Sequence, residues 1–214
     1  MRRGSLPANI VEVAQVILEA GAKREQSALN ETLELVSSGR VPRECSVQVP
    51  LIDLLCSYGA DPNHAMPAAV AHGEFEAVEA LMRNGGCLDL AVAAGLGRSE
   101  EARGLLGTAT PEDRHRALAL ASQFGHVEIV RLLLDAGEDP NRYNSVGSHS
   151  HSTPLHEAAA GGHDCVVRLL VERGARLDVK DTLWQGTPAD WAHHEGKIEI
   201  EAYLRARQAR ARDD

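Results

Sequence analysis

The chain repeats itself. The segment ASQFGHVEIVRLLLDAGEDPN, residues 121–141, aligns without a gap with AAAGGHDCVVRLLVERGARLD, residues 158–178. Each copy holds the end of one short helix, a Gly-His pair, an apolar second helix with Leu-Leu, and a closing glycine. A helical hairpin of this size cannot cover its own apolar face, so such hairpins must stack and shield one another from water. The repetition therefore predicts an all-α solenoid.

Two glycines mark each hairpin, one between its helices and one after the second helix. They lie 12 residues apart in three hairpins: Gly73 and Gly85, Gly125 and Gly137, Gly162 and Gly174. Glycine suits these places because a residue that ends a helix with positive φ is least strained without a Cβ. The hairpin that turns at Gly39 is eight residues longer, and the Gly97 hairpin has Ala109 at the second marker.

The motifs STPLHEAA, residues 152–159, and GGHDCVVRLLVERGA, residues 161–175, identify the repeat. They resemble an ankyrin repeat, with its TPLH, paired alanines, Gly-His, Val/Leu-rich second helix and Gly-Ala turn. The resemblance implies an all-α ankyrin-repeat solenoid of stacked helix-turn-helix units, of an irregular, bacterial type. It places one domain over residues 1–214, with a half repeat at 7–22 and units at about 26–60, 64–86, 87–109, 112–137, 152–175 and 187–210.

The connections between units differ in length. An ordinary ankyrin repeat uses about 21 residues between these markers, since its period is about 33. Here the spacing is 14 residues from Gly59 to Gly73 but 25 from Gly137 to Gly162. In the family these connections, called fingers, form a concave binding face together with the first helices. The resemblance therefore implies that the enlarged C-terminal fingers bind a ligand, although a tolerated surface insertion would look the same.

Aromatic residues make up only 3% of the chain, and four of them lie near this expected surface. Tryptophan and tyrosine are the usual anchors of protein interfaces, although Phe124 and Trp191 could instead fill space between repeats. The expected partner-binding residues are Arg142, Tyr143, Asn144, His149, His151, Leu183, Trp184, Gln185, Phe124, Glu157, Trp191 and His194.

The histidines divide into two groups. His156, His126 and His163 occupy the TPLH and Gly-His positions, where the resemblance implies structural hydrogen bonds to nearby backbone or threonine. His149 and His151 match no repeat position. They could contact a partner, or they could bind zinc with His156 or Asp181, because zinc needs three or four ligands. The alternative function is therefore a metal- or small-molecule-binding protein, with or without catalysis, that uses this loop.

Composition excludes several classes of function. A net charge of −9 argues against binding to duplex nucleic acid, which calls for a basic surface. No stretch approaches the roughly 18 apolar residues of a membrane helix. The sequence contains no nucleophile elbow and no dinucleotide fingerprint, so we expect no enzyme and no cofactor. These features predict a non-catalytic module that binds another protein.

The four cysteines lack CxxC spacing, which favours a reducing compartment and a cytoplasmic protein. Three of them stand in apolar-periodic stretches, where we expect buried thiols. In the last unit, Asp190 replaces the TPLH histidine and Lys197 replaces that of Gly-His, so we expect a changed tether there.

The two ends also differ in character. Residues 7–22 read as a second helix without a first, so Ile10, Val13 and Ile17 are expected to leave apolar surface uncovered. Self-association through this helix would cover it. The last helix, residues 197–210, becomes strongly charged and is expected to act as a C-terminal cap.

Overall fold

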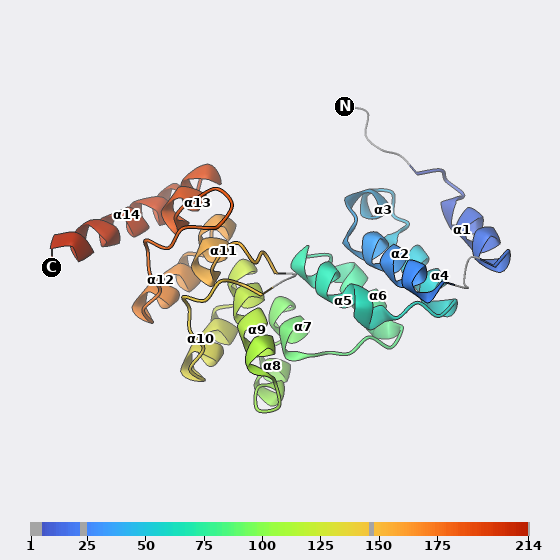
Figure 1. The fold of residues 1–214 in the computed structure, drawn as a ribbon, viewed down its shortest axis with the longest axis horizontal. Helices are drawn as coiled ribbons and strands as arrows, with labels where there is room; N and C mark the ends of the chain where they lie inside the picture. Colours follow the sequence, from blue (N-terminus) through green and yellow to red (C-terminus); the bar gives the residue numbers. More distant parts are fainter. Residues whose placement is uncertain (1–5, 22–24, 146–147, 214) are drawn as a thin grey trace. The chain divides into compact units, whose positions relative to one another are not determined.

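The computed structural model describes residues 6–21, 25–145 and 148–213, and throughout this part of the chain every regular element is a helix (Figure 1). The predicted all-α ankyrin solenoid is confirmed. The chain divides into two compact units, residues 1–88 (unit 1) and residues 89–214 (unit 2), which are described separately below. The single domain over residues 1–214, and the boundaries of its repeats, remain predictions.

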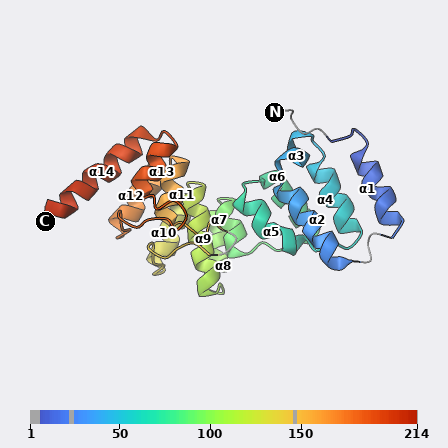
Figure 2. The ribbon, with the colours of Figure 1, turned by 45° about the horizontal axis from the view of Figure 1, so that its top comes forward.

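Unit 1 is built from hairpins whose helices pack side by side. Its helices are α1 (Ile10–Glu19), α2 (Gln26–Ser38), α3 (Arg40–Glu44), α4 (Gln48–Ser57), α5 (Pro62–Ala71) and α6 (Phe75–Arg83). Helix α2 contacts α4 and α5, α6 contacts α4 and α5, and α1 packs on α4 (Figure 2). Leu33, Ile52 and Leu81 are fully buried between them. Residue 22, the predicted end of the half repeat, lies outside the described residues.

Unit 2 contains four further hairpins. Its helices are α7 (Leu90–Gly95), α8 (Ser99–Leu105), α9 (Pro111–Gln123), α10 (Val127–Asp135), α11 (Pro154–Gly161), α12 (Asp164–Glu172), α13 (Pro188–His194) and α14 (Ile198–Asp213). The first helices α7, α9, α11 and α13 contact one another in chain order, and α10 packs between α8 and α12. Stacking buries Leu118, Leu133 and Leu170 completely. Each stacked helix thus contributes its apolar face to a shared core.

The turn glycine and the next turn histidine form one structural device in unit 2. The His126 ring bonds the Gly95 carbonyl at 3.1 Å, and the His163 ring bonds the Gln123 carbonyl at 2.8 Å. Each ring lies against the turn glycine of the preceding repeat, since a Cβ on Gly125 would stand 2.5 Å from His163 Nδ1. The predicted structural role of these histidines is confirmed. Glycine and histidine recur together because the histidine ring of each repeat fills the space where a Cβ on the preceding repeat's turn glycine would stand.

Gly39 departs from the predicted pattern. Its φ is −85° rather than positive, because the chain leaves α2 in an extended conformation and enters the inserted helix α3. The prediction of a left-handed turn is therefore wrong here. Glycine is still required by space, since a Cβ on Gly39 would meet the Leu35 carbonyl oxygen at 2.5 Å.

The expectation of buried thiols is also wrong. Cys45 and Cys56 are half-buried, while Cys87 and Cys165 are exposed, and all four are unpaired. Cys165 stands on the outer side of α12, whose opposite side holds the buried Val166 and Val167. Burial, followed by the charges of Asp53 and Asp61, raises the pKa of the Cys56 thiol to about 11.

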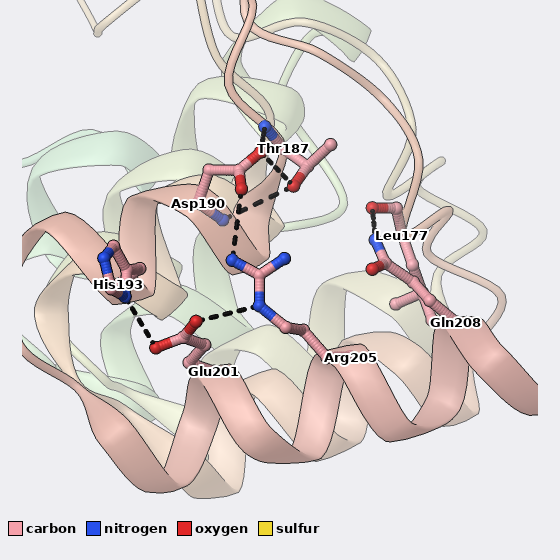
Figure 3. Close-up of polar contacts among 7 residues, drawn as sticks. All are labelled: Leu177, Thr187, Asp190, His193, Glu201, Arg205 and Gln208. Atoms are coloured by element: carbon pink, nitrogen blue, oxygen red, sulfur yellow. Dashed lines mark hydrogen bonds and ion pairs between the residues drawn. The ribbon is translucent and has the colours of Figure 1, made fainter.

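The last repeat replaces histidine tethers by charged groups (Figure 3). Asp190 accepts hydrogen bonds from the Thr187 backbone at 2.9 Å and the Thr187 hydroxyl at 2.7 Å, which caps α13. Arg205 of α14 donates to Asp190 at 3.3 Å and to Glu201 at 2.8 Å. Gln208 donates to the Leu177 carbonyl at 2.7 Å. The changed tether predicted for this unit is confirmed.

Candidate partner-binding surface

The long finger between α10 and α11 closes on itself. The Asn144 backbone N–H donates to the Ser152 carbonyl at 2.8 Å, and the Asn144 side chain donates to the Ser152 hydroxyl at 3.1 Å. The Ser152 N–H in turn donates to the His149 carbonyl at 3.0 Å. Residues 146–147 of the predicted binding loop lie outside the described residues. These bonds fix both arms of the finger to each other.

Two predicted contact residues are buried beneath this finger. Glu157 is 6% exposed and accepts a hydrogen bond from the Ser152 hydroxyl at 2.5 Å. Burial raises the pKa of Glu157, while the charges of His149 and His151 and the Ser152 hydrogen bond act in the opposite direction. Asn144 is buried as well. Their predicted place on an accessible surface is therefore wrong, because both side chains serve to hold the finger down.

The long finger is also tied to the next finger, residues 176–187. The Tyr143 hydroxyl donates to the Lys180 carbonyl at 2.6 Å, and the Thr182 N–H donates to the His151 carbonyl at 2.9 Å. On its other side the His115 ring bonds the Tyr143 carbonyl at 3.0 Å. Arg142 forms an exposed ion pair with Glu112 at 3.2 Å. Arg142 and Tyr143 are thus held at the surface by neighbouring elements.

Asp181 organises the second finger. Its buried carboxylate accepts hydrogen bonds from the backbone N–H groups of Leu183, Trp184 and Gly186 at 2.9, 2.6 and 2.8 Å. It also accepts one from the Trp191 indole at 3.0 Å. Burial raises the pKa of Asp181, but these four hydrogen bonds outweigh it and lower the pKa to about 2. The carboxylate therefore fixes the finger tip and one tryptophan ring together.

The tip of this finger presents apolar side chains to solvent. Trp184 is 71% exposed and Leu183 is 61% exposed, although Asp181 anchors the backbone of both. Gln185 has a left-handed φ of 59°, and its side chain donates to the Asp181 carbonyl at 3.2 Å. Large apolar side chains on a backbone that is already fixed are typical of interface anchors, because little conformational entropy is lost when a partner binds.

Five rings gather where the two fingers meet, and we call them the aromatic cluster: His149, His151, His156, Trp184 and Trp191. His151 stands edge-on to Trp184 with ring centroids 5.2 Å apart, and it lies 5.6 Å from Trp191. The Trp191 ring also contacts His156 at 5.2 Å and Trp184 at 6.1 Å. His149 lies 6.0 Å from His151. The sequence analysis placed His149, His151, Trp184 and Trp191 at one surface, and the structure packs them together with His156, for which only a structural role was expected.

A pocket of about 640 Å³ opens beside the aromatic cluster, and we call it the tryptophan pocket. Its lining residues come from both fingers and from the first helices α11 and α13: His149, His151, Ala160, Trp184, Gly186, Asp190, Trp191, His194 and Glu195. A smaller hollow of about 380 Å³ lies near Tyr143 and Gln185. The fingers and the first helices are the elements that the sequence analysis expects to bind a partner.

The remaining predicted residue, Phe124, lies away from the aromatic cluster. Phe124 is half-buried at the end of α9, with its ring 6.4 Å from that of His126, and it lines neither of these two pockets.

The sequence did not reveal Asp181 as the centre of the second finger, although an aspartate ahead of a turn is a known signal for hydrogen bonding between its side chain and the backbone. Instead it suggested Asp181 as a metal ligand.

The histidine loop does not assemble a metal site in the part of the chain that the structure describes. No group of three or more His, Cys, Asp or Glu side chains could hold a metal ion there. His156 bonds the Thr153 hydroxyl at 2.8 Å and the Gly186 carbonyl at 3.1 Å. Asp181 binds four N–H donors. Both proposed third ligands are thus already engaged.

Comparison with known proteins agrees with this architecture. The family model "Ankyrin repeats (3 copies)" matches residues 46–181. The chain belongs to the ankyrin repeat family. Ankyrin repeats mediate protein–protein interactions, and members of the family are typically non-catalytic interaction modules. The bacterial type of these repeats remains an expectation. Within the described residues, no helix is both long enough and apolar enough to cross a bilayer.

Three relatives illustrate the range of ankyrin repeat proteins that the chain is similar to. It is 29% identical over 210 residues to the ankyrin repeat and KH domain-containing protein mask-1 of Caenorhabditis elegans, covering 90% of this chain and 8% of that protein. It is 35% identical to human cyclin-dependent kinase inhibitor 2A, covering 55% of this chain and 75% of the relative. It is 34% identical to bovine cyclin-dependent kinase 4 inhibitor B, covering 59% and 96% respectively.

Proposed function

We propose that this ankyrin repeat protein is a non-catalytic module that binds a partner protein through its enlarged C-terminal fingers and the adjoining first helices. The observation that carries the proposal is the pair Leu183 and Trp184, exposed to solvent yet fixed by the buried Asp181. Exposing two large apolar side chains side by side has no benefit for folding. A prepared contact surface accounts for them.

The partner would contact the two fingers together. Tyr143, His149 and His151 from the long finger and Gln185 from the next would surround the anchors, with Trp191 and His194 at the mouth of the tryptophan pocket. Because both fingers are already held by internal hydrogen bonds, little chain entropy would be lost on binding. Two of the relatives described above are named as cyclin-dependent kinase inhibitors, which supports an interaction role.

Two lesser expectations belong to the same proposal. We place the protein in the cytoplasm, which its four unpaired thiols support.

Self-association through α1 is the other expectation, supported by the exposed side chains of Val13, Val16 and Ile17. Sedimentation of wild type beside a Val16→Glu, Ile17→Glu variant tests it, and a monomeric wild type would refute it.

Affinity capture with quantitative mass spectrometry tests the main proposal. Wild type, a Leu183→Ser, Trp184→Ser variant and a Leu35→Ser control would be immobilised and exposed to the same cell extract. Leu35 is a suitable control because it is a large apolar residue, equally exposed, in unit 1. We expect proteins retained by wild type and control to be lost from the double variant. Identical protein sets on all three, with all three folded by circular dichroism, would contradict the proposal.

A further inference from the structure

The tryptophan pocket is lined by two tryptophans, two carboxylates and three histidines. The exposed Trp184 and the half-buried Trp191 form one side, and Asp190 and Glu195 lie among the other lining residues. None of the nine lining residues is Lys or Arg, and the basic side chains among them are His149, His151 and His194. A flat aromatic face beside carboxylates attracts a cation, because the ring quadrupole and the charge act in the same direction.

The two carboxylates do not contribute equally. Both oxygens of Asp190 are already bonded, Oδ2 to Thr187 and Oδ1 to Arg205 (Figure 3). Glu195 is the C-cap residue that follows α13, and its side chain is exposed at the pocket. Glu195 is thus the carboxylate placed to meet an incoming charge. The chain as a whole carries a net charge of −9, which favours the approach of a basic segment.

We propose that the tryptophan pocket receives an arginine side chain of the partner protein, stacked on Trp184 and paired with Glu195. This inference rests on the proposed function and adds the chemistry of the partner to it. Arginine fits better than lysine because its planar guanidinium can stack on an indole while it donates hydrogen bonds to a carboxylate. Its methylene stem would lie along the apolar part of the lining.

Both tryptophans of the chain line this pocket, so their signals report on it without interference. The experiment titrates the full ¹⁵N-labelled chain with the peptide acetyl-Gly-Ser-Arg-Ser-Gly-amide and follows the two indole N–H resonances. Matched peptides carry citrulline, a neutral isostere of arginine, or leucine. We expect the arginine peptide to shift both resonances and to bind at least about fivefold more tightly than the citrulline peptide.

Two variants assign the charge. Glu195→Gln should weaken binding of the arginine peptide about threefold or more, because one charge-assisted contact is lost. Glu172→Gln removes an equal charge from an exposed position on α12 that does not line the pocket, and it should leave the affinity within about 1.5-fold, as expected for a screened distant charge. Trp184→Leu should abolish the shift of the remaining indole.

The outcomes separate this inference from the proposed function. Equal binding of the citrulline or leucine peptide, no binding of any peptide, or equal weakening by the two glutamate variants would each overturn the arginine pocket. If partner capture still depends on Leu183 and Trp184, the proposed function stands in those cases. Conversely, arginine-specific binding without any change in captured proteins would refute the proposed function and leave the pocket chemistry intact.

Discussion

The two units solve the same stacking problem with different polar chemistry. Both use an asparagine side chain to bind the backbone of the next connection: Asn63 accepts from the Cys87 N–H at 2.8 Å in unit 1, and Asn141 accepts from the Arg176 N–H at 2.7 Å in unit 2. They differ after the turn glycine. Two repeats of unit 2 have a histidine there, His126 after Gly125 and His163 after Gly162, whereas unit 1 has the buried Glu74 after Gly73.

The insertion in unit 1 explains this difference. Glu74 forms an ion pair with Arg43, which lies in the inserted helix α3. A buried carboxylate without a partner would cost several kcal/mol, and the inserted segment supplies the cation that Glu74 requires. In unit 2, extra chain length instead builds the fingers around Asp181 and Ser152. Added residues thus stabilise the stack in one unit and create an ordered outer surface in the other.

The largest effect in this comparison is expected for Asp181→Ala. It would leave four N–H donors without their acceptor, and we expect the free energy of unfolding of unit 2 to fall by about 3 kcal/mol. Urea unfolding followed by tryptophan fluorescence measures it, since both tryptophans lie in unit 2.

Asp178→Ala is the matched control, because this aspartate is exposed and pairs only with the nearby Arg176 in the same finger. We expect a change within about 0.5 kcal/mol. Equal losses for Asp178 and Asp181 would show that Asp181 is not the organising residue.

Acid should weaken unit 2 before unit 1. Burial lowers the pKa of His115, His126 and His156 below the ordinary value of 6.5, against partial compensation by their hydrogen bonds to carbonyls. The unfolded chain therefore binds more protons below pH 6.5. Titration of these histidines leaves the free energy of unfolding unchanged above pH 6.5. Below that pH the free energy of unfolding falls with decreasing pH by up to about 1.4 kcal/mol per pH unit for each histidine.

Urea unfolding of unit 2 between pH 7.5 and 5.0, read by tryptophan fluorescence, measures this slope. A His126→Gln variant should flatten it. A stability that stays constant over this range, or increases toward acid, would contradict the lowered pKa of these histidines.

Stronger acid should then release the second finger. The pKa of Asp181 is about 2, against an ordinary value of 3.8, so its ionised form contributes about 2 kcal/mol above pH 4. This contribution should disappear as the pH falls from about 4 to 2, and it should be missing from Asp181→Asn. Parallel pH profiles for wild type and Asp181→Asn in this range would refute it.

In unit 1, Arg43→Ala tests the compensating ion pair. Removing the arginine leaves the carboxylate of Glu74 buried without its cation, and we expect a loss of about 2 kcal/mol. Hydrogen exchange of the amides in α5 and α6 measures the loss. Arg43→Ala combined with Glu74→Gln should recover part of the stability, and Arg40→Ala, from an exposed pair on the same helix, should have little effect. No recovery in the double variant would argue against a charge effect.

The sequence predicted the stack because stacking rests on local patterns. Apolar periodicity, turn glycines and the Gly-His pairs each recur at fixed spacing, and the structure places His126 and His163 in the expected roles. It could not predict which polar side chains become buried in the fingers. Glu157 and Asn144 look like surface residues, and only the closure of the long finger buries them.

The same limit applies to single positions inside the repeats. Gly39 is a glycine at a turn position but lacks the positive φ of the other turn glycines, because the inserted helix α3 redirects the chain. Cys165 stands in an apolar run but on the outer side of α12. Periodicity gives the identity of an element, whereas these details depend on contacts between segments that are distant in sequence.

The smallest effect on stability is expected at the surface that matters most for binding. Leu183→Ser with Trp184→Ser should change the free energy of unfolding by no more than about 0.5 kcal/mol, since both side chains are largely exposed. Urea unfolding followed by circular dichroism measures it. A loss above 2 kcal/mol would show that these residues support the fold rather than a partner.

Hydrogen exchange of the chain, free and bound to a captured partner, tests the central claim most directly. Amides in residues 142–151 and 181–195 should gain protection on binding, while those in residues 25–88 of unit 1 should exchange as before. Protection confined to unit 1, with the C-terminal fingers unchanged, would contradict the account.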